Sequence, residues 1–101
     1  GSTRCGMLKI DVEGAELKVI DGAERMIRRD RPIMVVEINR VTLERFHALD
    51  WRRLFDRVVG FTYRAAIIRN SGRLHPVASA DEMAEIFDRG HDLLNILATP
   101  M

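Results

Sequence analysis

The stretch Ile33-Met34-Val35-Val36-Glu37-Ile38-Asn39 decides the fold class of this 101-residue chain. Its four leading apolar residues predict a strand, and the unbroken apolar run predicts cover on both faces of that strand. Asp30-Arg31-Pro32 stands directly before it and ends a helix, because proline has no N–H to donate and disfavours helix in the residue before it. A buried strand that follows a helix indicates an α/β fold.

The segment before this strand predicts another strand and a helical region. Met7–Val12 is a short apolar run that suits a buried strand. Ala15–Arg29 then carries apolar residues at the spacing of one helical stripe. Gly22 interrupts that stripe, and Asp21 followed by Glu24 resembles a capping arrangement, so two short helices and one long helix both remain open.

The segment after the strand continues the alternation of helices and strands. Thr42 is expected to cap a helix that restarts at Asp50, with inward-facing residues Leu43, Phe46, Leu54, Phe55 and Val58. A strand is expected at Phe61–Ile68, followed by a turn at Asn70–Arg73 and a hairpin arm at Leu74–Val77, which Pro76 restricts to an edge of the sheet. Ser79 and Glu82 form a capping box at the start of another helix, and a last strand is expected at Leu93–Ala98. Strands separated by helices predict a mainly parallel, Rossmann-like sheet of about four strands, flanked by helices.

Composition bounds the class of protein. Hydrophobic residues make up 47% and charged residues 31%, which is typical of a soluble globular domain. A net charge of +1 gives no electrostatic reason to expect nucleic acid or an acidic membrane surface as a partner. No apolar run approaches the roughly 20 residues of a membrane span, and no secretion leader is recognisable. With Cys5 as the single cysteine, we expect a cytoplasmic protein. Residues 1–6 read as a tag remnant or disordered start, and residues 7–101 as one domain unit.

Acidic and amide side chains follow both buried strands. Asp11 and Glu13 close the first, and Glu37 and Asn39 close the second. Adjacent parallel strands lie just under about 5 Å apart, so these groups are expected to converge on one rim. A carboxylate there can act as a general base, position a substrate hydroxyl or amine, or ligate a divalent metal. The alternative is structural, with Glu13 capping the next helix and Glu37 solvated.

The segment Leu8-Lys9-Ile10-Asp11-Val12-Glu13-Gly14-Ala15-Glu16-Leu17 resembles the signature of the FkbM-type methyltransferases. The likeness continues through Asp21–Glu24, Arg31–Ile33 and Glu37. It extends more weakly to Gly60–Tyr63 and Asn95–Pro100. The resemblance implies a Rossmann-like domain that transfers a methyl group from S-adenosylmethionine to an oxygen, or less often a nitrogen, of a small molecule or glycan.

The resemblance also assigns roles to the acids. It implies Asp11 as the first catalytic candidate and Glu13 as the second, with Glu13 also able to place the substrate. Glu37, with Asn39 beside it, is then a substrate-binding candidate. Related O-methyltransferases hold magnesium at such strand ends, but we predict no metal here.

The cofactor-binding half of such a domain has no counterpart in the sequence. The family holds the methionine part of its cofactor with a glycine-rich turn, and no two glycines here are close enough for a G-x-G turn. We therefore expect the C-terminal half of a methyltransferase domain, inactive as an isolated chain, with cofactor-binding residues unknown. Its partner is expected to be a separate N-terminal half or a second copy, through the edge of Met7–Val12. The alternative is a non-catalytic interaction or assembly module.

The remaining candidate groups predict no further site. The three histidines show no zinc-ligand spacing, and His47 is expected to be a partly covered surface residue. Arg28–Arg31 and Arg52-Arg53 are interleaved with acids, which favours a solvated face over a nucleic-acid footprint. Trp51 is expected to pack partly buried rather than stack on a ligand.

Overall fold

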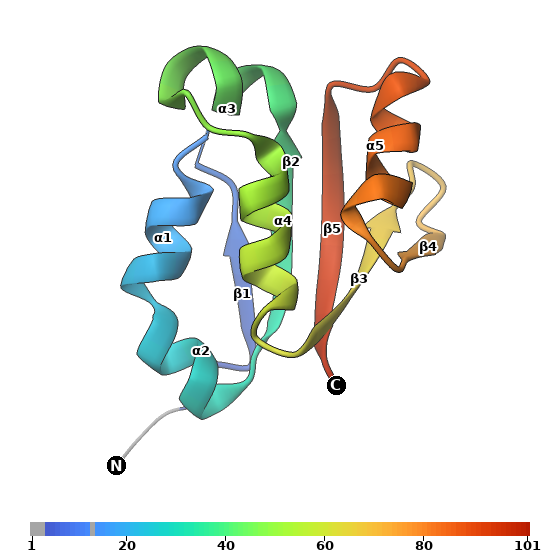
Figure 1. Cartoon of the computed structure of the whole chain (residues 1–101). Helices are drawn as coiled ribbons and strands as arrows, with labels where there is room; N and C mark the ends of the chain where they lie inside the picture. Colours follow the sequence, from blue (N-terminus) through green and yellow to red (C-terminus); the bar gives the residue numbers. More distant parts are fainter. Residues whose placement is uncertain (1–3, 13) are drawn as a thin grey trace.

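The computed structural model describes residues 4–12 and 14–101, which form one mixed sheet with helices against it (Figure 1). In chain order, the elements of this part are β1 (Met7–Ile10), α1 (Glu16–Gly22), α2 (Glu24–Asp30), β2 (Ile33–Asn39), α3 (Arg40–His47), α4 (Trp51–Val59), β3 (Tyr63–Ile68), β4 (Leu74–Val77), α5 (Ala80–Asp88) and β5 (Leu93–Pro100). No helix in the described residues is long and apolar enough to cross a membrane.

The sheet has the strand order β1-β2-β5-β3-β4, and it is mostly antiparallel. Only β1 and β2 pair in parallel, whereas β5 runs antiparallel to both β2 and β3, and β4 runs antiparallel to β3. The prediction of a mainly parallel sheet of about four strands is therefore wrong, since the described residues form five strands. The α/β class and the hairpin from β3 to β4 are confirmed.

The physical reason for the difference lies in which strands become neighbours. Every pair of strands joined through helices does run in the same direction: β1 with β2, β2 with β3, and β4 with β5. The last strand, however, returns between β2 and β3 instead of adding at an edge (Figure 1). Helical crossovers fix the relative direction of two strands but not whether they are neighbours. Because β5 lies between β2 and β3, two antiparallel pairings stand where a parallel pairing of β2 with β3 was expected.

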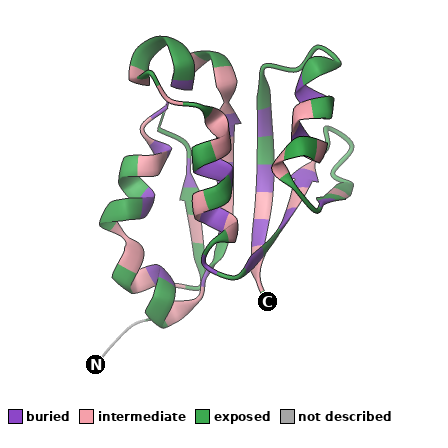
Figure 2. Ribbon diagram, in the orientation of Figure 1, coloured by how far each residue is buried: buried purple, intermediate pink, exposed green. Residues whose placement is uncertain are grey.

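The described helices cover one face of the sheet. In β2, Met34, Val36 and Ile38 are fully buried, while Ile33 on the opposite face is 42% exposed and Val35 is half-buried (Figure 2). The same alternation runs through β3 and β5. Cover on both faces of β2, predicted from its apolar run, is therefore wrong for the described part of the chain. The run reflects one buried face and one apolar face that stays open.

Side-chain caps mark the starts of α3, α4 and α5 but not those of α1 and α2. Of the two alternatives left open for the first helical region, the structure has two short helices, α1 and α2, which meet at Ala23. No side-chain cap is formed there, so the capping arrangement predicted from Asp21 and Glu24 is wrong. Asp50 caps α4 and Ser79 caps α5, as predicted. The cap of α3 is Asn39 rather than Thr42, because Asn39 Oδ1 accepts hydrogen bonds from the N–H groups of Val41 and Thr42 at 3.1 and 3.0 Å.

The predicted inward faces of α3 and α4 are mostly confirmed. Leu43, Leu54, Phe55 and Val58 are buried, but Phe46 is 71% exposed. Because α3 ends at His47, Phe46 lies in its last turn and points away from the core.

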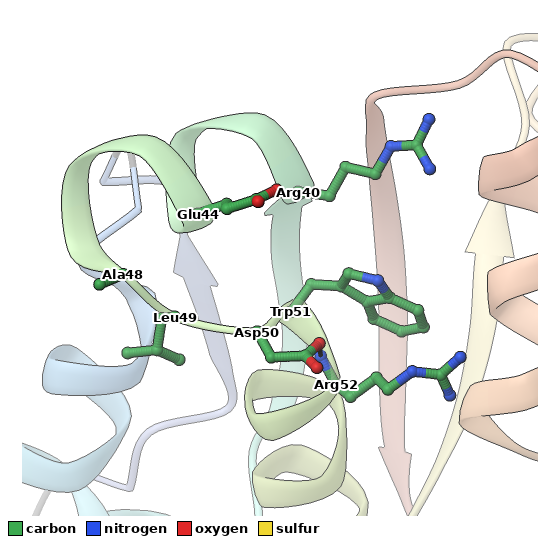
Figure 3. A pocket seen from close by; sticks show the side chains of 7 residues that line it. All are labelled: Arg40, Glu44, Ala48, Leu49, Asp50, Trp51 and Arg52. Atoms are coloured by element: carbon green, nitrogen blue, oxygen red, sulfur yellow. Dashed lines mark hydrogen bonds between the residues drawn. The ribbon is translucent and has the colours of Figure 1, made fainter.

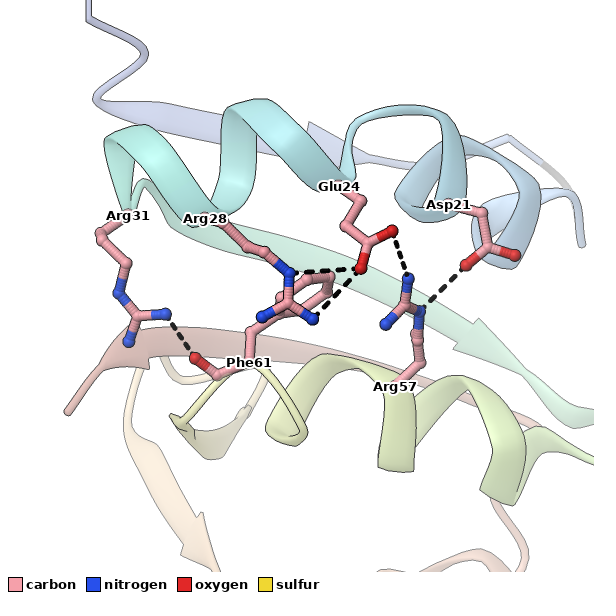
Figure 4. A network of polar contacts seen from close by, with 6 residues as sticks. All are labelled: Asp21, Glu24, Arg28, Arg31, Arg57 and Phe61. Carbon is pink, nitrogen blue, oxygen red and sulfur yellow. Dashed lines mark hydrogen bonds and ion pairs between the residues drawn. The ribbon is translucent and has the colours of Figure 1, made fainter.

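An arginine network ties α1 and α2 to the neighbouring helix α4 (Figure 4). Arg57 of α4 contacts Asp21 at 2.9 Å and Glu24 at 3.4 Å, and Arg28 also pairs with Glu24. The guanidinium groups of Arg28 and Arg57 lie 5.0 and 4.8 Å from the centre of the buried Phe61 ring. Arg28, which the sequence predicted on a solvated face, therefore also packs on an aromatic ring.

Asp30 lies at the end of α2, with only 2% of its side chain exposed. Arg29, together with the backbone N–H of Cys5, lowers the pKa of Asp30 from 3.8 to about 2. Because the pKa is lower in the folded state, this aspartate stabilises the fold above its unfolded pKa, and the stabilisation is lost as the pH falls towards 2.

We predict that the free energy of unfolding of the wild type falls between pH 4 and 2, and that Asp30→Asn makes this fall smaller. Urea unfolding at several pH values measures it. Asp56→Asn, at an exposed position of α4, should keep the wild-type pH dependence. An equal pH dependence of the free energy of unfolding in the wild type and in Asp30→Asn would contradict the stabilising role assigned to the Asp30 carboxylate.

Candidate functional site

A row of polar residues crosses the open face of the sheet where β1 and β2 end. The parallel register pairs Ile10 with Val36, so Asp11 follows at the position beside Glu37. On its other side, Glu37 pairs with Asn95 of β5. Neighbours in register share one face of a sheet, and Val36 beside Glu37 points into the core. Asp11, Glu37 and Asn95 therefore share the open face, and Asp11 and Asn95 are exposed.

The remaining predicted site residues are placed as follows. Asn39 ends β2 at the same rim, with its Oδ1 engaged in capping α3. Glu13 lies outside the described residues. The register of β1 and β2 thus leads Asp11 to the position beside Glu37.

A buried carboxylate shapes the loop between β1 and α1. Glu16 is 1% exposed and is the only charged residue buried to this degree in the described chain. Its Oε2 accepts hydrogen bonds from the N–H groups of Val12 at 2.9 Å and Gly14 at 3.2 Å. Its Oε1 is buried with no hydrogen-bond partner among the described residues. Glu16 therefore fixes the backbone of the loop that starts at Asp11.

The end of α3 packs against the same loop. Gly14 has a φ of +96°, and a Cβ placed there would lie 2.5 Å from His47 Cδ2 and 3.0 Å from Thr42 Cγ2. Both the backbone conformation and the close approach require glycine. His47, a half-buried residue at the end of α3, thus lies against the loop that carries the candidate acids.

This arrangement suits the acceptor side of a group transfer. The row offers carboxylate oxygens that can accept a proton or a hydrogen bond from a hydroxyl group, and an amide that can donate one. Within residues 4–12 and 14–101, no three His, Cys, Asp or Glu side chains are grouped as they would be to hold a metal ion.

A separate pocket of about 590 Å³ opens between α3 and the start of α4 (Figure 3). Its lining includes Arg40, Trp51 and Arg52, whose side chains extend towards α5. Arg40 pairs with Asp92 at 3.2 Å, Arg52 pairs with Asp81 at 3.0 Å, and the Trp51 ring packs 4.9 Å from that of Phe87. These contacts hold α5 onto the helical layer. The pocket does not include Asp11 or Glu37. Trp51 is partly buried and packs on the Phe87 ring, which confirms the packing role expected of it.

The comparison with known families bears on the loop and rim just described. The family model of the methyltransferase FkbM domain matches residues 1–67, from the start of the chain into β3. The chain belongs to the FkbM methyltransferase family. No curated protein and no solved structure matches it. The match includes Asp11, Glu16 and Glu37 of this FkbM-family chain, and it ends before Asn95.

Sequence reasoning did not identify three residues of this site. Glu16 belongs to the signature segment and stands between two apolar residues, Ala15 and Leu17. These apolar neighbours were the only indication in the sequence that Glu16 could be buried. Asn95 required the antiparallel insertion of β5, and His47 lies 33 positions after Gly14. Neither had a signal in local spacing.

We predict that Gly14→Ala destabilises the fold by about 2 kcal/mol or more, because a positive φ and a steric clash add. Gly72→Ala is the matched control, since Gly72 has a φ of +86° with open space around it, and we expect about 1 kcal/mol there. The free energy of unfolding in urea measures both. Adding His47→Ala to Gly14→Ala should recover the steric part. Equal losses at Gly14 and Gly72 would show that His47 does not restrict the loop.

We also predict that Glu16→Gln speeds hydrogen exchange at the N–H groups of Val12 and Gly14 by about tenfold or more, because a neutral amide accepts hydrogen bonds more weakly. Exchange followed by NMR measures it. Glu85→Gln, on the exposed side of α5, should leave both rates unchanged. Unchanged exchange rates in Glu16→Gln would show that the Glu16 carboxylate does not hold the backbone of this loop.

Proposed function

We propose that this chain supplies the acceptor-binding wall of an S-adenosylmethionine-dependent methyltransferase that acts on a hydroxyl oxygen of a small molecule or glycan. The observation that carries the proposal is the row formed by Asp11, Glu37 and Asn95 at the rim of the sheet. Family membership supports methyl transfer as the reaction class. Oxygen is proposed as the acceptor atom because the resemblance implies it, and a carboxylate in the row can accept the proton of a hydroxyl group.

In this proposal the carboxylates act on the acceptor. Asp11, exposed at the end of β1, accepts the hydroxyl proton as the oxygen attacks, which is general-base catalysis. Glu37 and Asn95 orient the acceptor by hydrogen bonds, since they lie beside Asp11 on the same face. In the sequence, Glu13 is a second acid two positions after Asp11, and Asn39 borders the row. The hydrogen bonds that Glu16 accepts from Val12 and Gly14 keep the loop after β1 in one conformation. Catalysis that depends on orienting the acceptor requires such a fixed loop.

The described residues do not fit a complete site for S-adenosylmethionine. None of the described glycines stands within two positions of another, so no G-x-G turn is present among them. Glu16, the acid that lies buried next to this rim, is engaged with its own loop. The isolated 101-residue chain is therefore proposed to be inactive, with the donor bound by residues other than these.

A second candidate function is a non-catalytic assembly module. The free edge of β1 and the open apolar face of the sheet favour it, because both are surfaces that can pair with another chain. Acceptor binding at the rim distinguishes the two candidates, since an assembly module has no need of a hydroxyl-binding row.

We predict that the isolated chain binds no S-adenosylmethionine in a calorimetric titration and gives no methyl transfer. We predict further that D-galactose, used as a polyhydroxyl probe, shifts the NMR amide signals of Asp11, Glu37 and Asn95 in the same chain. Asp11→Asn with Glu37→Gln should weaken these shifts, while Asp56→Asn should not. Micromolar binding of S-adenosylmethionine would contradict our account of the missing donor site. Probe-induced shifts confined to other residues would contradict the acceptor site.

A further inference from the structure

The strands β5 and β3 separate from each other at the rim of the sheet that carries the polar row. Their antiparallel pairing ends at Ile67 and Ile96. Beyond this point, residues 93–95 of β5 pair with β2 but not with β3, and Ile68 pairs with β4 but not with β5. Figure 1 shows the two strands diverging towards this end. The sheet is therefore split at the rim, beside the carboxyl end of β3.

A cavity of about 360 Å³, here called the β3–β5 cavity, lies at this split. Asn95 lines it, so the polar row leads from Asp11 and Glu37 into the cavity. Because an antiparallel strand directs its backbone groups alternately to its two sides, at least one residue of 93–95 turns its N–H and C=O towards the split. No strand pairing uses these groups. The crevice at strand ends is where open α/β sheets bind ligands, and the volume is that of a small-molecule site.

Arg69 gives the β3–β5 cavity its charge. It is the only Arg, Lys, Asp or Glu among the described residues that line the cavity. Asp88 and Asp92, which lie close in sequence to the lining, both pair with Arg40. Arg69 Nη2 donates a hydrogen bond to His75 Nδ1 at 2.8 Å, which orients the guanidinium group. Its other N–H groups can bind an anion, and their planar arrangement matches a carboxylate.

The rest of the lining combines hydrogen-bonding groups with an apolar wall. Asn70 and Ser71, in the turn after β3, and His91, after α5, can each donate a hydrogen bond to a ligand. Isoleucine and leucine side chains of β3, α5 and β5 form the wall. Such a wall suits the C–H face of a sugar ring, while the polar groups suit its hydroxyls. It also lowers the local dielectric constant, which strengthens an ion pair with Arg69.

We propose that the β3–β5 cavity binds an acidic sugar, with its carboxylate on Arg69 and its ring against the apolar wall. A carboxylate is the expected anion because the cavity offers one cation for one negative charge. All lining residues except Ile67 lie beyond residue 67, where the family match ends, so this specificity comes from the part of the chain outside the match.

The position of the cavity also bears on the size of the acceptor. Two to three strand spacings, about 10–14 Å, separate Asp11 from the cavity, which is more than one sugar ring covers. The acceptor is then a glycan whose acidic sugar lies beyond the sugar that is methylated. This assignment to the acceptor rests on the proposed function, whereas binding of an acidic sugar in the cavity does not.

NMR titration of the 101-residue chain with D-galacturonate tests the cavity. We expect it to shift the amide signals of Arg69, Asn70 and Ser71. The methyl ester of D-galacturonate has the same ring without the charge and should bind at least about tenfold more weakly, because the ion pair is lost. Arg69→Gln should remove this preference for the acid over the ester. Arg64→Gln removes the same charge from an exposed position near the start of β3 and should keep the preference.

Unchanged amide signals of β1 and β2 show that each variant keeps the fold. Equal binding of acid and ester by the wild type, or a preference that survives in Arg69→Gln, would overturn the proposal. D-Galactose 6-phosphate distinguishes the two kinds of anion. We expect it to bind more weakly than D-galacturonate, and tighter binding at the same signals would overturn the choice of a carboxylate.

3′-Sialyllactose, which joins one carboxylate-bearing sugar to two neutral sugars, tests whether the cavity and the polar row bind one glycan. We expect it to shift the signals of Arg69, Asp11 and Glu37 together, and Arg69→Gln should weaken all three shifts. Lactose should shift the row alone, equally in the wild type and in Arg69→Gln. Sialyllactose shifts confined to the cavity, with lactose shifts at the row, would overturn the assignment of the acidic sugar to the acceptor. Absence of lactose shifts at the row, with D-galacturonate still bound in the cavity, would contradict the proposed function instead.

Discussion

The antiparallel insertion of β5 between β2 and β3 is the constraint on which the rest of the structure depends. β5 pairs with β2 from Met34 to Asn39 and with β3 from Tyr63 to Ile67. Its buried residues Ile96 and Ala98 form the centre of the face that the helices cover. Without β5, β2 and β3 would have no ladder between them, and the hairpin of β3 and β4 would be separate from the family-defining first strands. The same insertion brings Asn95 next to Glu37 and so completes the polar row.

The loop after β1 is determined from two directions at once. The Glu16 carboxylate accepts hydrogen bonds from two backbone N–H groups of the loop. From α3, His47 leaves no space for a Cβ at Gly14. A loop held only by its own turn would leave Asp11 free to adopt many positions, and the entropy of ordering it would oppose ligand binding. The signature segment can therefore be read physically, with Gly14 and Glu16 shaping the loop and Asp11 facing solvent at the rim.

The sequence predicted local features well and long-range ones poorly. Strand β2, the stop at Pro32, the caps at Asp50 and Ser79, and the edge position of Pro76 depend on neighbouring residues, and all are confirmed. The direction of strand pairing and the coverage of the sheet depend on which distant segments meet, and the predictions of a mainly parallel sheet and of cover on both faces were wrong. At the site, the meeting of Asp11 and Glu37 followed from the parallel pairing of β1 and β2. The contact of His47 with Gly14 did not, because it depends on where α3 ends.

Asp11 and Glu16 show how one segment divides two tasks between its acids. Glu16 is buried, and one of its oxygens accepts hydrogen bonds from two backbone N–H groups, so it is committed to holding the loop. Asp11 is exposed beside the polar row, so its carboxylate stays accessible to a ligand on the open face. A carboxylate that served both tasks would have to give up backbone hydrogen bonds in order to contact a ligand. Holding the loop and meeting a ligand therefore fall to different residues of the signature segment.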